Sequence, residues 1–270
     1  MIKIKFLKLL LIVFVISNVA LAQDSWYYSP SLQMVGSDFQ DGSNHNSFFL
    51  YNGLRYQTQS FYLSLSIPIV FGNSNTFTQL GSTYIPNGSE NNDFDHGGNH
   101  TGNGGMNSTN IGFGDTYLNG SLQVIHETKF LPAFSIDGYI KFPTATASLG
   151  IGTGEFDSQI ALGIRKFVNR FSFFGQFGYL FIGDAEGAST INPYTISLGV
   201  GYMFGYGKHS ILLAYDSYTT IVQGFSSPKQ LAFGYNYMIN YGLYFTAIVS
   251  AGLNSSTSDY TISGGLNFEL

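Results

Sequence analysis

The sequence predicts an all-β fold, a transmembrane antiparallel up-and-down β-barrel of about twelve strands. Segments of roughly ten residues alternate at period two between a hydrophobic face and a small or polar face. Aromatic residues make up 17% of the chain and charged residues only 10%, whereas soluble domains carry about 25% charged residues. Beyond the N-terminal segment, no apolar run approaches the length of a membrane-spanning helix. A closed barrel is the other backbone geometry that satisfies every polar group inside a bilayer.

The N-terminal segment has the features of a secretory signal peptide. Three lysines come first, an apolar run from Leu9 to Val15 follows, and the segment ends on Ala20-Leu21-Ala22. A transmembrane anchor is the alternative, but the uncharged part has 14 residues, short of the ~20 that a spanning helix needs. The sequence therefore predicts that residues 1–22 are removed and that residues 23–270 form a barrel in the outer membrane of a Gram-negative bacterium.

The charge and cysteine counts exclude several classes of function. Without the three lysines of the signal segment, 8 basic residues remain against 16 acidic ones. An acidic chain with scattered positive residues is a poor candidate for binding nucleic acid. The absence of cysteine excludes disulfides, thiolate metal sites and a cysteine nucleophile. We expect no cofactor.

Twelve segments show strand periodicity. Between Phe61 and Ile69, for example, Phe, Leu or Ile at every second position alternates with Tyr, Ser or Pro, the pattern of a strand with one hydrophobic face. The expected strands lie near residues 26–36, 46–56, 60–71, 111–125, 133–143, 156–167, 170–183, 193–205, 209–218, 229–238, 241–251 and 259–270.

The connections between these segments alternate between short and long. The shorter ones fall near residues 57–59, 126–132, 168–169, 205–208 and 239–240. The longer ones fall near residues 39–45, 72–110, 144–155, 184–192, 219–229 and 254–259. Short periplasmic turns and long extracellular loops are the outer-membrane arrangement. An even number of strands also places both ends of the mature chain on the periplasmic side.

The last segment resembles the terminal strand of bacterial outer-membrane proteins. Hydrophobic residues or glycine occupy every second position from Tyr260 to Leu270, and Phe268 is the last aromatic. We therefore expect the outer-membrane assembly machinery to be a partner during biogenesis and outer-membrane lipid to surround the mature barrel.

The longest connection, residues 72–110, contains a candidate metal site. Its centre, NNDFDHGGNH, offers Asp93, Asp95, His96 and His100, whose oxygen and nitrogen atoms could hold a divalent cation. The cluster lacks the full calcium-loop pattern, and its Asn-, Gly- and Ser-rich surroundings favour a solvated loop. The interpretation without a metal is preferred. A structural or adhesive barrel that acts through this loop is the alternative to a channel.

A lipid hydrolase is the enzyme hypothesis that the residues allow. His45 and Ser47 are two apart and share one face of a strand. A lipid-acting site needs the outward face, but Phe48 and Leu50 occupy that face, and no G-x-S-x-G motif exists in the chain. The sequence therefore predicts a non-enzyme with no catalytic residue.

Parity along the strands predicts which side chains point into the lumen. The residues expected to line it are Tyr62, Asp115, Tyr117, Asp137, Tyr139, Lys141 and Arg165. The charged members are expected to form one ion-paired patch on adjacent strands. That patch could be structural, because charges inside a barrel pair to avoid isolation, or it could be a constriction for ligands. Inward glycines such as Gly163 and Gly199 either keep the bore open or allow close packing.

The stretch from Phe142 to Asp157, FPTATASLGIGTGEFD, has glycine at every second position near its end. A dinucleotide-binding loop requires G-x-G-x-x-G before a helix. Counting from Gly150, the third glycine would fall at Glu155, and the residues that follow alternate as a strand. The stretch is therefore expected to be an extracellular loop, with Asp157 helping to start the next strand.

Residues 111–167 resemble a known family. The segments FGDTYL, from Phe113, and LPAFSIDGYIKFPTATASLGIGTGEFD, from Leu131, are similar to the MetA-pathway of phenol degradation family of outer-membrane barrels. The family shows a Gly-Asp strand start, a Lys-x-Pro-Thr-Gly strand end, then Gly-x-Gly and an aspartate. The matching residues are Gly114, Asp115, Lys141, Pro143, Thr144, Gly152, Gly154 and Asp157, while Ala145 replaces the family's glycine.

The resemblance implies an outer-membrane channel connected with uptake of hydrophobic or aromatic compounds, and it implies no catalytic residue. Inward aromatic side chains suit a partly hydrophobic solute better than a bare ion channel. A barrel of twelve strands also lies between filled eight-stranded barrels and wide 16–18-stranded porins. The sequence therefore predicts passive passage of a small hydrophobic or aromatic solute.

Overall fold

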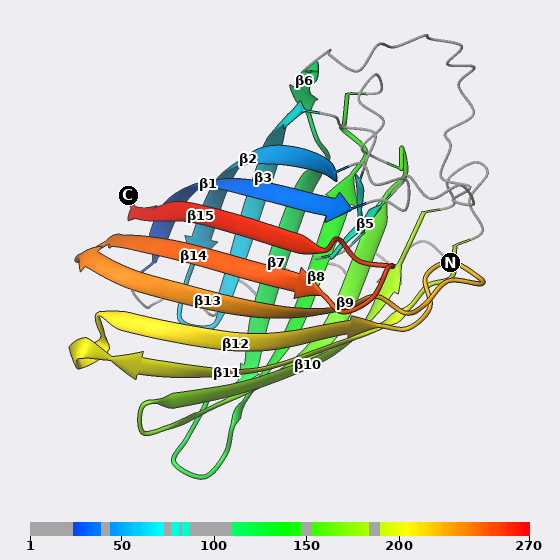
Figure 1. Cartoon of the computed structure of the whole chain (residues 1–270). Coiled ribbons are helices and arrows are strands. Elements are labelled where there is room, and N and C mark those ends of the chain that lie inside the picture. Colours follow the sequence, from blue (N-terminus) through cyan, green and yellow to red (C-terminus); the bar gives the residue numbers. More distant parts are fainter. Residues whose placement is uncertain are drawn as a thin grey trace, which may run out of the picture.

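The chain forms a closed antiparallel β-barrel, and the predicted fold is confirmed (Figure 1). The computed structural model describes residues 24–38, 44–72, 77–80, 83–86, 110–146, 153–183 and 190–270. The predicted signal segment, residues 1–22, lies outside these ranges, as do Asp93, Asp95, His96 and His100. Among the described residues, no helix is long and apolar enough to cross a membrane.

The main sheet has thirteen strand segments, of which β6 and β7 are two pieces of one barrel strand. The first half of the chain contributes β1 (Ser25–Asp38), β2 (Asn44–Gln57), β3 (Phe61–Gly72), β6 (Asn110–Phe113), β7 (Thr116–Ile125), β8 (Ala133–Phe142) and β9 (Asp157–Val168). The second half contributes β10 (Phe171–Phe181), β11 (Tyr194–Phe204), β12 (His209–Tyr218), β13 (Lys229–Asn240), β14 (Leu243–Gly252) and β15 (Tyr260–Glu269).

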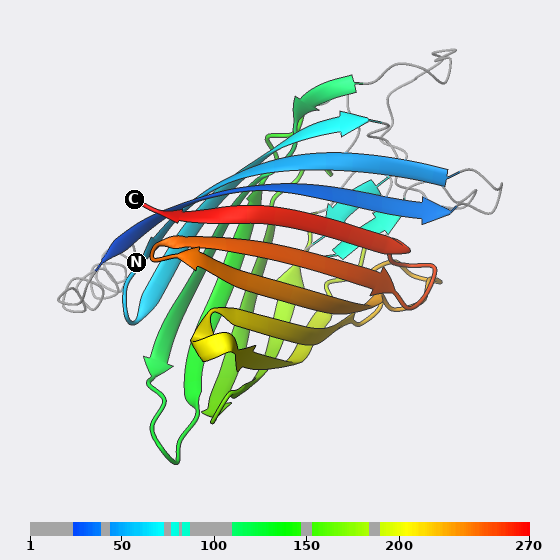
Figure 2. The same ribbon diagram turned by 60° about the vertical axis from the view of Figure 1, so that its left-hand side comes forward.

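The first and last strands close the barrel. Strand β1 pairs with β2 on one side and with β15 on the other, with a register that runs from Tyr27 opposite Glu269 to Gly36 opposite Tyr260. The C-terminus lies at the end of the barrel where the short turns join the strands (Figure 2). We refer to this end as periplasmic and to the opposite end as extracellular, following the outer-membrane arrangement.

The predicted strands agree with the observed ones to within two residues at each end. Two features differ from the prediction. The connection 72–110 contains a small hairpin of β4 (Phe77–Leu80) and β5 (Thr83–Pro86). The predicted strand 111–125 is interrupted at Gly114 and Asp115. There the amide N–H of Gly114 donates to the carbonyl oxygen of Pro68 on β3 (2.9 Å), so the wall stays hydrogen-bonded across the interruption.

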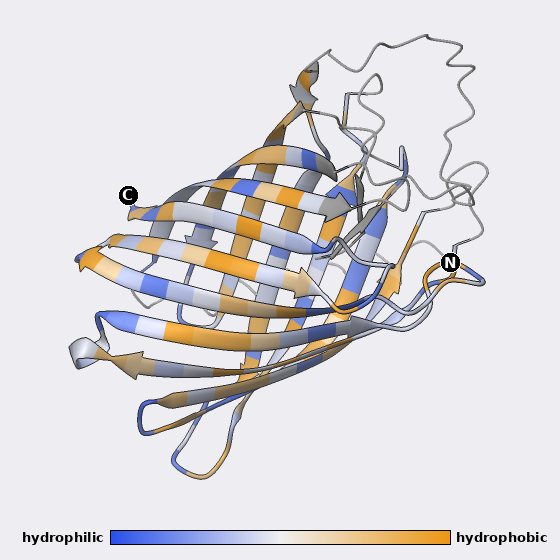
Figure 3. Cartoon of the chain, in the orientation of Figure 1, coloured by the Kyte–Doolittle hydropathy of each residue, from blue (hydrophilic) through white to orange (hydrophobic). Residues whose placement is uncertain are grey.

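The outward face of the wall is hydrophobic, as a lipid-facing surface requires. On β3, Leu63 is 49% exposed and Leu65 is 40% exposed, whereas inward-facing Val70 is fully buried. Along the strands, hydrophobic residues alternate with more polar ones (Figure 3). The period-two pattern of the sequence therefore reflects the alternation between side chains that face lipid and side chains that face the lumen.

Inward glycines allow close packing at the positions where the lumen is tightest. A Cβ added at Gly199 would collide with the ring of Phe174 from the neighbouring strand. A Cβ added at Gly163 would lie 2.6 Å from Oδ2 of Asp137. The sequence allows either an open bore or close packing at these glycines. At both positions a neighbouring side chain occupies the space, which is close packing.

Two apolar clusters fill the extracellular part of the interior. One consists of Val35, Phe49 and Val70, on β1, β2 and β3, with Tyr51 packed against it. The other, which we call the lid cluster, consists of Leu180, Ile182, Tyr218 and Ile221, with Tyr139 and Val222 packed against it. Ile221 comes from the connection between β12 and β13, so this connection turns into the bore. Ile221 accepts a hydrogen bond through its carbonyl oxygen from the N–H of Ile191 (2.6 Å).

Candidate functional site: the barrel lumen

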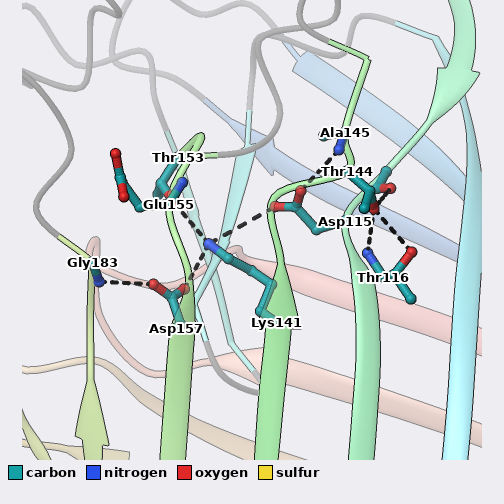
Figure 4. Close-up of polar contacts among 10 residues, drawn as sticks. Asp115, Thr116, Lys141, Thr144, Ala145, Thr153, Glu155, Asp157 and Gly183 are labelled. Carbon is teal, nitrogen blue, oxygen red and sulfur yellow. Dashed lines mark hydrogen bonds and ion pairs between the residues drawn. The ribbon is translucent and has the colours of Figure 1, made fainter.

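A buried ion cluster lies at the extracellular ends of β7, β8 and β9 (Figure 4). Nζ of Lys141 lies 2.6 Å from Oδ2 of Asp157 and 3.8 Å from Oδ2 of Asp115. It also donates to Oγ1 of Thr153 (2.7 Å). The three charged side chains are at most 5% exposed. We call Asp115, Lys141 and Asp157 the ion clip.

The remaining carboxylate oxygens of the ion clip hold loop backbone. Oδ1 of Asp115 accepts from the N–H of Ala145 (3.0 Å), and Oδ1 of Asp157 accepts from the N–H of Gly183 (3.0 Å). Ala145 lies in the connection after β8, and Gly183 lies in the connection after β10. The cluster therefore fixes two extracellular connections to the ends of three wall strands, and each buried charge has a partner, as buried charges require.

The predicted four-residue patch of Asp115, Asp137, Lys141 and Arg165 is wrong in its composition. Among the described residues, Lys141 pairs with Asp115 and Asp157, but not with Asp137. Lys141 and Asp137 share β8 but are four residues apart, about 13 Å at about 3.3 Å per residue. Arg165 donates weakly to Oε1 of Gln123 (3.4 Å) instead. Asp157 on β9 lies directly opposite Lys141 on β8. Aligning the β8–β9 hairpin would therefore identify Asp157 as the partner of Lys141.

Thr144 and Gly154, both motif residues, have local structural roles. Oγ1 of Thr144 accepts from the N–H of Thr116 (2.9 Å) and lies 3.3 Å from the carbonyl oxygen of Gly114, so it bridges the break between β6 and β7. Gly154 has a φ of +74°, a conformation that favours glycine, shortly before β9 starts at Asp157. Pro143 follows directly after β8, and Gly152 lies outside the described residues.

One cavity in the bore, which we call the upper cavity, has a volume of about 340 Å³. Tyrosines from five strands lie around it: Tyr51, Tyr62, Tyr117, Tyr139 and Tyr218. Amide and hydroxyl side chains make up most of the remaining lining, including Asn119, Gln159, Gln176, Thr195 and Ser197. Tyr139 and Tyr218 also belong to the lid cluster, so the lid cluster forms the extracellular wall of this cavity.

The other, which we call the lower cavity, is larger, with a volume of about 630 Å³. Its lining runs from Gln123 and Ala133 at the periplasmic ends of β7 and β8 to Asp216 and Gln230 near the extracellular ends of β12 and β13. Its lining consists mainly of small residues, including Ala133, Ser135, Gly163, Ala214, Ala232, Gly234, Ser250 and Ser263. Its charged lining residues are Asp137, Arg165 and Asp216. These small side chains leave more free volume than the tyrosines leave in the upper cavity.

Four residues line both cavities: Tyr62, Asp137, Gln176 and Ser197. We call them the girdle, because they lie where the upper cavity passes into the lower one. Of the predicted lining residues, Tyr62, Tyr117, Asp137 and Tyr139 lie on the upper cavity and Arg165 on the lower. Asp115 and Lys141 line neither cavity, since they are buried in the ion clip. Sequence reasoning does not identify Ile221, which lies in a connection without periodicity.

The alternative sites are only partly described. Ser47 is fully buried, away from the lipid face that a lipid hydrolase would need. The side chain of His45 lies outside the described residues, as does most of the connection 72–110. The metal and adhesion hypotheses for that connection therefore stay predictions.

The sequence of the chain matches a known family over most of its length. The profile of the family described as "Putative MetA-pathway of phenol degradation" matches residues 72–270. The chain belongs to this family. The predicted membership is thereby confirmed, and in this family member the three charged motif residues form the ion clip.

Solved structures confirm the fold of this family member. An outer membrane channel from Pseudomonas putida F1 superposes with a TM-score of 0.62 at 12% identity, over 93% of this chain and 97% of that chain. The KdgM porin, in complex with disordered oligogalacturonate, superposes with a TM-score of 0.52 at 10% identity, over 91% of this chain and 99% of that chain. No curated protein sequence matches significantly. The family member thus has the architecture of an outer-membrane barrel.

Proposed function

We propose that this protein is an outer-membrane channel for the passive uptake of small hydrophobic or aromatic solutes. The observation that supports this most is the pair of successive cavities inside the closed barrel, the upper of which is surrounded by five tyrosines. A solute that enters from outside would pass the tyrosine-lined cavity, the girdle and then the wider lower cavity.

The lining of the upper cavity suits a small ring with a polar substituent. Aromatic faces contact other rings in stacked or edge-to-face geometry, while tyrosine hydroxyls stay available for hydrogen bonds. Binding cavities of this kind combine a largely apolar surface with a few placed polar groups. Here the side-chain amides of Asn119, Gln159 and Gln176 supply both donors and acceptors.

The relatives support a channel rather than an enzyme. The two superposed proteins are an outer membrane channel and a porin, and the family description refers to phenol degradation. These similarities also favour the outer membrane as the location of the mature chain. Identities of 10–12% support the fold and leave the solute to be determined by experiment.

Liposome swelling and planar-bilayer recording on the purified barrel test this function. Phenylalanine is a suitable solute because it crosses lipid poorly without a channel, and glucose is a non-aromatic control of similar size. We expect discrete conductance steps and faster swelling in phenylalanine than in glucose. Absence of both current and flux, from protein whose electrophoretic mobility is heat-modifiable and therefore folded, would overturn the proposal. Equal rates for the two solutes would refute the aromatic preference alone.

A further inference from the structure

Asp137 holds a carboxylate at the junction of the two cavities. It lies on β8 and belongs to the lining of both cavities. Ser121 donates to Oδ1, and Oδ2 accepts from Oγ of Ser135 (3.0 Å) and Nε2 of Gln176 (3.0 Å). Three donors around one carboxyl group are the surroundings of an ionised carboxylate, which can only accept hydrogen bonds.

The wall of the barrel is shaped around this carboxylate. A Cβ at Gly163 would lie 2.6 Å from Oδ2, so glycine at this position of β9 leaves the space that Asp137 occupies. The donors are neutral, and among the described residues no ion pair neutralises Asp137. The contrast with Asp157 is direct, because Nζ of Lys141 lies 2.6 Å from its carboxylate.

Within the described part of the chain, no other charged group forms an ion pair with Asp137. Asp137 is the one charged residue among those that line the upper cavity. In the lower cavity Asp216 adds a second negative charge, and Arg165 is the single cation of the lining. Arg165 lies next to the ring of Phe167 (5.5 Å). Arg55 lies over the ring of Tyr27 (4.8 Å) and lines neither cavity.

We propose that Asp137 is the charge filter of the channel, which admits neutral and cationic solutes through the girdle and disfavours anions. The proposal rests on the proposed channel function. A fixed charge in a narrow, low-dielectric passage acts strongly on a passing ion because little water screens it. An aromatic solute with a carboxylate or sulfonate group would therefore cross more slowly than its neutral or cationic counterpart of the same size.

Reversal potentials in a planar bilayer under a potassium chloride gradient test this filter. We expect the wild-type channel to prefer potassium to chloride, and Asp137→Asn to lower the permeability ratio roughly 3-fold or more. Asp137→Glu keeps the charge and should restore the preference. The matched control is Asp216→Asn: Asp216 also accepts from a serine and a glutamine, Ser197 and Gln230, but lies only on the wider lower cavity. The permeability ratio should change less in Asp216→Asn than in Asp137→Asn.

A pair of permanently charged aromatic ions gives a second readout. Phenyltrimethylammonium and benzenesulfonate have one ring each and opposite charges, and bi-ionic potentials report their relative permeabilities. The wild type should prefer the cation, and Asp137→Asn should narrow the difference. A wild type that prefers anions, or equal shifts from Asp137→Asn and Asp216→Asn, would overturn the filter while leaving the channel intact. A folded protein without any conductance would overturn both the filter and the proposed function.

Discussion

Each end of the barrel has an ion pair between a lysine and a carboxylate, and the two pairs lie in different environments. At the extracellular end, the side chain of Lys141 is 1% exposed and that of its partner Asp157 is fully buried. At the periplasmic end, Nζ of Lys166 lies 3.3 Å from Oε1 of Glu127, but these side chains are 25% and 21% exposed. Asp157 and the third member of the ion clip, Asp115, each hold one extracellular connection through a backbone N–H group, whereas the second pair lies beside a partly exposed turn.

Because of this difference, we expect loss of the extracellular ion pair to destabilise the barrel more than loss of the periplasmic pair. Burial strengthens the attraction within the ion clip and makes the loss of one partner costly, while water screens the periplasmic pair. The extracellular end also holds the lid cluster, which contacts the smaller cavity through Tyr218. Selection of solutes is therefore expected at the upper cavity and at the girdle.

The largest expected effect is the loss of the ion clip. Lys141→Met leaves Asp115 and Asp157 as buried carboxylates without their cation. Breaking a buried pair by removing one partner costs about 3–5 kcal/mol. We expect a decrease of that size in the free energy of unfolding, measured by reversible urea titration in phospholipid vesicles.

Lys166→Met is the matched control for this measurement. It removes a lysine at the other end of the barrel, where both charged side chains are partly exposed and Nζ also donates to backbone carbonyl oxygens of the turn, so its effect should be smaller. If the two variants lose the same stability, the proposed contrast between the two ends is wrong. A double variant, Lys141→Met with Asp157→Leu, removes one of the two carboxylates left without a cation and should recover part of the loss.

The lid cluster should limit current through the extracellular half. Ile221 is 1% exposed and packs against Leu180 and Tyr218. Ile221→Ala removes apolar contacts that hold the connection inside the bore, so single-channel recordings should show longer open times or a larger conductance. Ile191→Ala is the control, because Ile191 belongs to the same end of the barrel but is 46% exposed. Unchanged currents for Ile221→Ala would show that the cluster does not close the path.

The sequence predicts the wall of the barrel better than its interior. Period-two alternation is local and one-dimensional, so strand ends can be read to within two residues. Parity also places Tyr117 and Asp137 on the lumen side, where the structure has them on the upper cavity. The partner of Lys141 depends on hairpin register instead, since one shift along β9 would exchange Asp157 for an outward residue.

The lid cluster is a feature that no local pattern predicts. Ile221 and Val222 are two apolar residues in a polar connection, and their burial depends on tertiary contact with Leu180 of β10 and Tyr139 of β8. The break at Gly114 is similar, because it depends on Pro68 of β3 and on Thr144 beyond β8. Both features arise from contacts between segments distant in the sequence.

The smallest expected effect concerns the pH dependence of the periplasmic turn. The N–H of Phe167 donates to Oε1 of Glu127 (2.9 Å), and this hydrogen bond, with the nearby Lys166, lowers the pKa of Glu127 below its ordinary value of 4.5. A lowered carboxyl pKa stabilises the folded state above the unfolded pKa, and the contribution is lost as the pH falls through the folded pKa. The stabilisation by Glu127 is therefore present at neutral pH and disappears below pH 4.5.

Comparison of the wild type with Glu127→Gln across this range measures the effect. The difference in the free energy of unfolding should be constant and small near neutral pH and should shrink in acid. Glu155→Gln is the control at the extracellular end, because Glu155 is exposed and its carboxylate makes no hydrogen bond or ion pair with the described residues. If the difference in the free energy of unfolding between the wild type and Glu127→Gln stays constant through the acid range, the contacts with Phe167 and Lys166 do not stabilise the charged form of Glu127. If Glu127→Gln lowers the free energy of unfolding as much as Lys141→Met does, the periplasmic ion pair is not weakened by solvent as proposed.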